Sequence, residues 1–349
     1  MNKALTTKVI IDPRARIAYA SFYIKGIQDL FGARNVSFNI APFLDVIKKY
    51  DDSAFDQFFA FILIEKSLIK KVVVDYKDSY PINLEAYKWC DVYGKVNLNY
   101  EKTDLSVYNK LIPIGPGFGI RIWSIPMTIL RAGLNFIKSF RHLDTKLYSF
   151  FYGYYWQTRR LPITEFSRAQ TDGSYVFFVS TLWTQDNCVQ STNVLRADFV
   201  RVYNTLNVNF EGGLYAKPSN PEYSKYKDLV YTDFISFPTY FKKIRRSSVV
   251  FNTPSVYNCH GWKLGEFFAL GKAIISTPLS NMMPVELEHG KHIHFITDSS
   301  GLKDAIQKIL TDNDYRALLE KGTSEYYNNY LAPTKVIQRL VKPLSSERQ

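Results

Sequence analysis

A donor-rich loop followed by a short helix with one acid is the part of the chain best suited to chemistry. The loop Cys259-His260-Gly261-Trp262-Lys263 leads into an apolar helical pattern over 262–270, which Glu266 interrupts. Backbone N–H groups at a helix N-terminus favour anions, and a carboxylate beside them suits hydroxyls such as those of a ribose or a sugar. The loop and the acid together predict a pocket for a sugar nucleotide.

Length and composition indicate a globular protein of two domains. The chain has 349 residues, 46% of them hydrophobic and 16% aromatic, which is too long for one ordinary core and too apolar for a disordered chain. No run approaches the roughly 18–20 apolar residues of a membrane span, and Asp12-Pro13-Arg14 ends the first apolar run too early for a signal peptide. Three widely spaced cysteines predict a reducing, cytoplasmic compartment. The net charge of +12 favours an anionic partner, either nucleic acid, an anionic membrane surface or a phosphorylated substrate.

Alternating strand and helix patterns predict an α/β fold in the first 120 residues. This alternation implies a mostly parallel sheet that helices cover on both sides. The apolar run 58–64 is compatible with a doubly buried strand or with part of a helix. The other expected strands are 8–12, 36–38, 71–75 and 111–119, with an extended segment at 91–98, and the expected helices are 18–31, 43–50 and 84–90.

A second α/β unit is expected from residue 171 onward. Six short strands separated by helices predict a second doubly wound domain. The expected strands include 175–180, 208–210, 229–232, 249–251 and 273–276, with a turn at 211–213, and the expected helices are 193–206, 238–246, 262–270, 302–310, 315–321 and 334–341.

The stretch 121–170, between these two parts, is basic and aromatic. Eight Lys or Arg residues and two acids lie between 121 and 168, interleaved with aromatic side chains. Two interpretations stay open. One is a surface that sits on an anionic bilayer, at the inner face of a membrane. The other is a helical insertion whose aromatic side chains pack inside the protein.

Two α/β domains with a loop, a helix and an acid late in the second resemble the GT-B glycosyltransferases. The local match is to the retaining, family-4-like group (glycosyl transferases group 1), and Glu266-Phe267-Phe268-Ala269-Leu270-Gly271 with the apolar strand after it carries this match. The resemblance implies two Rossmann-like domains with a cleft between them. They are an acceptor-binding domain at 1–120 and a donor-binding domain at 171–330, with a C-terminal helix within 331–349 that crosses back to the first domain.

The resemblance also implies roles for individual residues. Glu266 would bind the ribose hydroxyls of the donor, the loop 260–263 would face its phosphates and sugar, and the segment 232–235 would bracket its base. Asn258 stands where the family has a first Glu, which is a departure from the pattern. The expected donor site comprises Ser180, Thr181, Arg196, Phe234, Ile235, Asn258, His260, Gly261, Lys263, Glu266 and Glu286.

A second departure concerns the end of the strand at 175–180. Many relatives carry an Arg and a Lys there, aimed at the diphosphate, whereas this chain has Ser180 and Thr181. Their hydroxyls and backbone amides can substitute, and Arg196 and Lys263 are the candidate counter-charges.

Asp12 and Arg14 follow the first strand, at the end of the sheet where open α/β folds place their ligands. Asp12 is the candidate general base that deprotonates the acceptor hydroxyl, and a helix-capping Asp is the alternative. Arg14, Lys95 and Gly117 are the candidate acceptor-binding residues.

The leading hypothesis is transfer of a sugar, of the hexosyltransferase type, from a nucleotide-sugar to an acceptor hydroxyl, with neither metal nor cofactor. The acceptor would be a glycan or lipid-linked glycan in the assembly of a bacterial-type surface polysaccharide, capsule or lipopolysaccharide. A nucleotide-sugar epimerase of the same architecture is the first alternative. A nucleic-acid-binding protein is the second, although no recognition motif occurs. His289, His292 and His294 lack the further ligands that a metal site needs.

Overall fold

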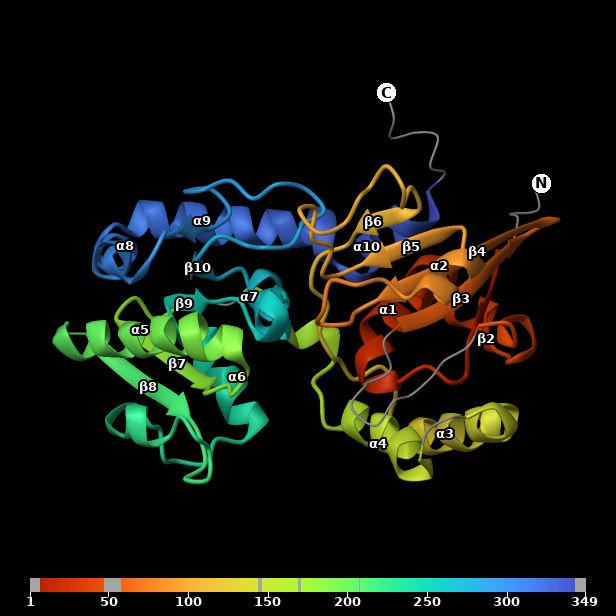
Figure 1. Ribbon diagram of the computed structural model, residues 1–349, viewed down its shortest axis with the longest axis horizontal. Helices are drawn as coiled ribbons and strands as arrows, with labels where there is room; N and C mark the ends of the chain where they lie inside the picture. Colours follow the sequence, from red (N-terminus) through yellow and green to blue (C-terminus); the bar gives the residue numbers. More distant parts are fainter. Residues whose placement is uncertain (1–6, 47–57, 144–145, 169–170, 207, 343–349) are drawn as a thin grey trace. The chain divides into compact units, whose positions relative to one another are not determined.

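The computed structural model describes residues 7–46, 58–143, 146–168, 171–206 and 208–342 and divides into two compact units (Figure 1). Each unit combines β-strands with helices, so the predicted α/β fold class is confirmed. The first unit consists of Met1–Phe166, Met282–Pro284 and Tyr330–Gln349, and the second of Ser167–Asn281 and Val285–Asn329.

A six-stranded sheet in the order β2-β1-β3-β4-β5-β6 forms the centre of the first unit. β2 is parallel to β1, and β4, β5 and β6 are parallel to one another, while β3 runs antiparallel to both of its neighbours. The strands are β1 (Lys8–Ile11), β2 (Val36–Phe38), β3 (Phe58–Glu65), β4 (Leu68–Asp75), β5 (Val92–Lys95) and β6 (Leu111–Pro113).

The expectation of a mostly parallel sheet in this half of the chain is confirmed, and β3 is the exception among the described strands. The apolar run 58–64 is a strand, and only residues 66–67 separate it from β4. A connection this short joins antiparallel strands, because parallel ones need a crossover of a dozen residues or more. Lys66 takes a positive φ of 55°, as such a tight turn requires. The sheet of this unit is therefore mixed.

Helices pack on this sheet and extend beyond it. They are α1 (Ile17–Phe31), α2 (Leu84–Trp89), α3 (Ile125–Ser139), α4 (Leu147–Thr158) and α10 (Pro333–Val341). The C-terminal helix α10 packs against α1 and β5, and Leu340 lies over Gly94 of β5. The helix expected at 43–50 is a 3-10 turn, Ala41–Phe43, as far as the structure describes it, and its part beyond Val46 lies outside the described residues.

The close packing of α1 on α10 depends on Gly26. A Cβ built there would lie 2.2 Å from the carbonyl oxygen of Pro333. We expect Gly26→Ala to lower the free energy of unfolding by about 1–3 kcal/mol, because backbone must move to admit the methyl group. Gly133 of α3 is the matched control, since a Cβ there meets nothing within 4 Å. Gly133→Ala should raise the same quantity by up to about 1 kcal/mol. Urea unfolding followed by tryptophan fluorescence measures both, and equal effects at the two glycines would contradict the packing argument.

The second unit holds two parallel ladders. One pairs β7 (Tyr175–Thr181) with β8 (Asn209–Tyr215), and the other has the order β11-β10-β9, with β9 (Val249–Asn252), β10 (Ala273–Ser276) and β11 (His294–Phe295). β7 and β9 lie next to each other. The helices of this unit are α5 (Asn193–Thr205), α6 (Phe237–Arg246), α7 (Trp262–Ala269), α8 (Leu302–Thr311) and α9 (Asn313–Tyr326). Its core includes the stacked rings of Phe199 and Phe251, whose centroids are 4.5 Å apart.

Two predictions in this unit are wrong. The turn expected at 211–213 lies inside β8, because Gly212, with φ 156°, lets the strand pass close to β7; a Cβ there would lie 1.9 Å from the carbonyl oxygen of Phe178. The strand expected at 229–232 is the end of a 3-10 helix, Ser224–Leu229, followed by a single bridge between Val230 and Leu214. The described residues of this unit therefore form five named strands in place of six.

Candidate functional site

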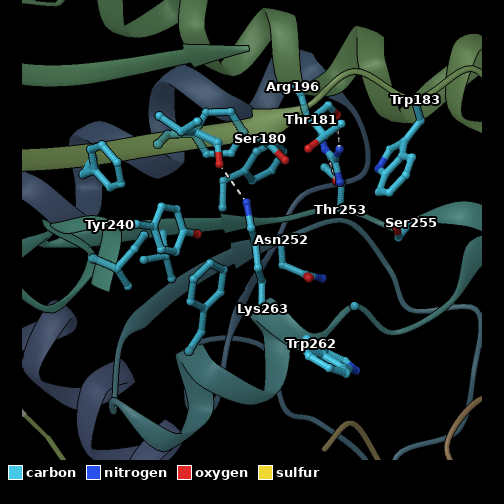
Figure 2. A pocket seen from close by; sticks show the side chains of 18 residues that line it. Ser180, Thr181, Trp183, Arg196, Tyr240, Asn252, Thr253, Ser255, Trp262 and Lys263 are labelled. Carbon is cyan, nitrogen blue, oxygen red and sulfur yellow. Dashed lines mark hydrogen bonds between the residues drawn. The ribbon is translucent and has the colours of Figure 1, made fainter. Parts of the chain in front are cut away.

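A pocket of about 180 Å³ opens in the second unit where β7 and β9 end and α7 begins. The carboxyl ends of parallel strands are where open α/β sheets bind ligands. β7 contributes Ser180 and Thr181 to the lining, β9 contributes Asn252, and the loop that follows β9 contributes Thr253 (Figure 2). The remaining lining side chains labelled there are Trp183, Arg196, Tyr240, Ser255, Trp262 and Lys263.

Arg196 reaches the pocket from α5 and is held by two hydrogen bonds. Its Nε donates to Thr253 Oγ1 at 3.0 Å, and one terminal nitrogen donates to the carbonyl oxygen of Thr181 at 2.7 Å (Figure 2). Burial lowers the pKa of the guanidinium to about 10, so it is charged at neutral pH. A guanidinium carries five N–H donors, and these two bonds leave the others for a further acceptor.

Lys263 extends from the first turn of α7 toward β7 (Figure 2). Its Nζ donates to the carbonyl oxygen of Val179 at 2.7 Å and lies 5.3 Å from the centre of the Tyr240 ring. Burial, followed by the charge of Arg196, lowers the pKa of Lys263 to about 7, while Glu266 acts in the opposite direction. Within the described ranges neither cation forms an ion pair with a carboxylate. Two cations face one small pocket, which is an arrangement suited to an anion.

Glu266 lies one turn into α7 and is buried, but it does not line the pocket. Its charge nevertheless affects the site, because it adds to burial in raising the pKa of Tyr240 and partly offsets the lowering of the pKa of Lys263. His260, in the loop before α7, is also buried and also lies outside the lining, whereas Gly261 is part of it. The structure thus brings Lys263 and Gly261 to the pocket and sets Glu266 behind it.

Asn258 supports the loop that precedes α7. It adopts a positive φ of 58°, its side-chain oxygen accepts a hydrogen bond from Asn187 at 3.3 Å, and its carbonyl oxygen accepts one from Asn281 at 2.9 Å. Asparagine tolerates this left-handed conformation better than glutamate does, which is a physical reason for its presence.

Three other predicted donor residues lie away from the pocket lining. Phe234 is 93% exposed, Ile235 is half-buried beside it, and Glu286 is exposed. Thr232 and Asp233, in the same loop as Phe234, line a separate cavity of about 270 Å³ beside β8. Their roles in binding stay predictions.

In the first unit, Asp12 and Arg14 form a buried ion pair after β1. Nε and one terminal nitrogen of Arg14 donate to the two carboxylate oxygens of Asp12, each at 3.0 Å. The same terminal nitrogen also donates to the carbonyl oxygen of Phe43 at 2.8 Å. Asp12 is fully buried and Arg14 is 6% exposed. The pair is built as a structural clamp, and the assignment of Asp12 as a base stays a prediction.

Lys95 is likewise engaged within its own unit. Its Nζ donates to Asp75 at 3.0 Å and to the carbonyl oxygen of Ser79 at 3.1 Å, and Tyr93 donates to the same carboxylate. Burial and the charge of Asp75 hold the pKa of Tyr93 well above its usual range. Gly117 packs against Tyr23, whose hydroxyl would lie 2.9 Å from a Cβ at that position. These two residues support the sheet end where Asp12 and Arg14 lie.

The pocket includes residues that sequence reasoning did not name as ligands. Asn252, Thr253 and Tyr240 all line it, and Asn252 donates to Ser276 Oγ at 2.9 Å. The sequence carries a signal for Asn252 and Thr253, because they stand at the end of a buried strand, where open α/β sheets place their ligands. Tyr240 carried no such signal, since it lies within α6. Among the described residues, no group of three His, Cys, Asp or Glu side chains is arranged to hold a metal ion.

Neither a protein-family model nor a curated protein matches the sequence. Several solved structures are similar, all at low identity. The C-terminal domain of a glycosyl transferase group 1 family protein, LpcC from Francisella tularensis, is 12% identical with a TM-score of 0.38, over 48% of this chain and 96% of that one. HepE from Anabaena, in complex with UDP and glucose, is 11% identical with a TM-score of 0.41, over 75% of this chain and 65% of that one. A putative UDP-N-acetylglucosamine 2-epimerase from Listeria monocytogenes is 10% identical with a TM-score of 0.39, over 75% and 60%.

The matches thus include glycosyltransferases, the class that the sequence resembles, as well as an epimerase. The chain spans less than half the length of two other matching chains, at 44% and 46%. At these identities the likeness concerns the fold alone, and with TM-scores this low it carries no weight for the activity.

Proposed function

We propose that the protein is a glycosyltransferase whose nucleotide-sugar donor places its diphosphate in the pocket between β7, β9 and α7. The observation that carries this proposal is the pairing of Arg196 and Lys263 on one small pocket, with no carboxylate in an ion pair with either among the described residues. A bound diphosphate would supply the missing counter-charge. Its oxygens would accept hydrogen bonds from the N–H groups of Arg196 and Lys263 that are not already bonded to Thr253, Thr181 and Val179.

The size of the pocket supports the same assignment. Pockets that hold an entire small molecule measure roughly 300–1,000 Å³, whereas this one measures about 180 Å³. It fits the charged middle of a nucleotide-sugar better than the whole molecule. Negative charge develops on the leaving diphosphate during sugar transfer, so fixed cations at that place would stabilise the transition state. Arg196 is held by two hydrogen bonds before any ligand arrives, which keeps it preorganised.

Glu266 is proposed to act on the donor through Lys263 and the α7 turn. Its carboxylate is buried and lies outside the pocket lining, yet it opposes the burial that lowers the pKa of Lys263. Contact with the ribose hydroxyls, as the sequence resemblance implies, would require the donor to extend past the α7 N-terminus. The finer parts of the proposal, which are a hexose donor and a surface-polysaccharide acceptor, rest on that resemblance alone.

A nucleotide-sugar epimerase is the second candidate, because it would need the same diphosphate contacts. The two functions differ in their products. A transferase releases a nucleoside diphosphate when an acceptor is present, whereas an epimerase changes the sugar and leaves the nucleotide attached.

Titration calorimetry with UDP, GDP and dTDP at pH 6.5 tests the pocket, and chromatography of the matching nucleotide-sugars, with and without a glycan acceptor, tests the reaction. We expect one nucleotide to bind and its sugar conjugate to release nucleoside diphosphate. Conversion of the sugar without release would favour the epimerase. If no nucleotide binds and no conjugate is consumed, the proposal is wrong.

A further inference from the structure

Helix α3 turns its large apolar side chains away from the protein. Its buried positions recur every three or four residues, so they form one stripe along the helix, and the side chains there are small or polar. In a helix that packs on a globular core the apolar stripe faces inward, which is the opposite arrangement. The buried stripe consists of Thr128, Ala132, Asn135 and Ser139. The exposed large apolar side chains are Ile125, Met127, Ile129, Leu130, Leu134 and Ile137.

Buried hydrogen bonds fix this orientation. The side-chain oxygen of Gln157 in α4 accepts from the backbone N–H groups of residues 122–123 at 2.7 and 3.1 Å, and its nitrogen donates to Thr128 Oγ1 at 3.0 Å. Asn135 donates to the hydroxyl of Tyr154 at 2.9 Å. Rotating α3 to bury its apolar side would break the bonds of Thr128 and Asn135, and each buried polar group left unpaired costs about 1–3 kcal/mol.

Helix α4 lies beside α3 at one edge of the first unit (Figure 1). Its aromatic rings extend the exposed surface. Tyr148 is 70% exposed and Tyr155 is 54% exposed. The ring of Tyr152 lies 5.0 Å from that of Tyr148 and 5.6 Å from that of Trp156. Tyrosine and tryptophan are enriched where a protein meets the interface of a bilayer, because one end of the ring system is apolar and the other is polar.

The charged residues in the sequence of these helices are mostly basic. Between residues 121 and 160 the sequence has seven Lys or Arg residues and one acid. Arg141 lies over the ring of Phe140 and Arg160 over that of Trp156, at 5.5 and 5.8 Å from the ring centres. The exposed cations are Arg121, Lys138, Arg141, Lys146 and Arg159.

We propose that the outer face of α3 and α4 docks on the surface of an anionic lipid bilayer, with the apolar side chains of α3 at the acyl boundary and the cations on the headgroup phosphates. Charge complementarity selects this occupant. A second copy of the chain, related by a two-fold axis, would bring the same cations against each other. The face does not depend on the reaction proposed for the second unit. None of the helices in the described part of the chain is long and apolar enough to cross a membrane.

Flotation of the full chain with vesicles tests this surface. We expect the chain to bind vesicles that contain phosphatidylglycerol. Its affinity for vesicles of pure phosphatidylcholine should be lower by about tenfold or more, since each cation near an anionic surface contributes roughly 1 kcal/mol. Leu130→Gln/Ile137→Gln should reduce binding to the anionic vesicles at least about tenfold, because two large apolar side chains are lost from the boundary.

The matched control is Leu68→Gln/Ile69→Gln, at the β3–β4 turn, which removes two exposed apolar side chains elsewhere on the same unit. It should bind vesicles within about twofold of wild type, the scatter expected for a change away from the contact. Equal loss in both variants, equal binding to both vesicle types, or no binding at all would overturn the proposal. A second outcome would also overturn it. In that case the wild type self-associates in sedimentation without lipid and does not bind vesicles, and Leu130→Gln/Ile137→Gln abolishes the self-association.

Discussion

Replacement of Lys263 by methionine should weaken binding of the nucleoside diphosphate about 10- to 150-fold at pH 6 and, at the same time, stabilise the folded protein. The loss of affinity corresponds to one charge-assisted hydrogen bond, which contributes roughly 1.5–3 kcal/mol. The gain in stability follows from the cost of keeping an ammonium group beside Arg196 in a buried place, which lowers the pKa of Lys263 to about 7. Methionine fills similar space without a charge. A variant that becomes more stable as it loses binding marks a side chain kept for function.

The lowered pKa of Lys263 determines how both the stability gain of Lys263→Met and the nucleotide affinity of the wild type change with pH. In the unfolded chain Lys263 has a pKa of about 10.4, above its folded value of about 7. Between these values the unfolded state binds more protons, so the contribution of Lys263 to stability rises with pH across this window. The advantage of Lys263→Met should therefore be greatest below pH 7 and vanish above about pH 10.4. Nucleotide affinity of the wild type should fall as the pH rises through 7 and beyond, because the ammonium group loses its proton.

Lys272 is a suitable control, because its pKa is lowered to about the same value as that of Lys263 but it lies outside the pocket lining. Burial lowers its pKa to about 7 as well, and its Nζ donates to the carbonyl oxygen of Arg245 at 2.9 Å, outside the pocket lining. Lys272→Met should show a similar pH-dependent change in melting temperature, yet bind nucleotide within about twofold of wild type, as expected for a distant site. Calorimetry and thermal melts at pH 6 and pH 9 measure both variants. Unchanged affinity in Lys263→Met would remove the pocket from consideration as the phosphate site.

Local patterns in the sequence predicted the elements that carry this pocket. The helix expected at 262–270 is α7, and Gly271 follows it with a positive φ of 59°, which is the conformation that favours glycine at a helix end. The strand expected at 175–180 is β7, and it ends at the pocket. These predictions depend on short-range periodicity and on turn chemistry, which a sequence displays directly.

Features that depend on distant contacts escaped the same reasoning. The turn predicted at 211–213 failed because its glycines serve close strand packing instead of chain reversal. The position of Glu266 behind the pocket is set by which face of α7 packs inward, and a helix with apolar residues on most sides does not reveal that. In α3 the large apolar side chains face outward, whereas in most helices of a globular protein they face the core. The apolar periodicity of a sequence identifies which residues share one side of a helix. Whether that side faces the core or the solvent depends on the elements that pack against the helix.

Asp12→Ala should lower the free energy of unfolding by about 3–5 kcal/mol, because it removes the carboxylate that the buried guanidinium of Arg14 contacts at 3.0 Å. Arg14 is 6% exposed and also holds the backbone at Phe43 through a hydrogen bond of 2.8 Å. The single variant therefore cannot separate a structural role of Asp12 from a catalytic one, since either would abolish activity. Urea unfolding measures the stability loss, and a value below about 1 kcal/mol would contradict the ion-pair argument.

The double variant Asp12→Ala/Arg14→Met separates the two roles. Removing both charges together should restore most of the lost stability, because the buried ion pair is removed as a unit and methionine occupies much of the volume of the arginine. If Asp12 is the general base, this variant should fold and bind the nucleotide normally, while its kcat for sugar transfer falls about 100-fold or more, as expected for loss of general base catalysis. If the restored fold transfers sugar at near the wild-type rate, Asp12 and Arg14 form only the structural clamp that ties the end of β1 to Phe43, and another group must accept the proton of the acceptor hydroxyl.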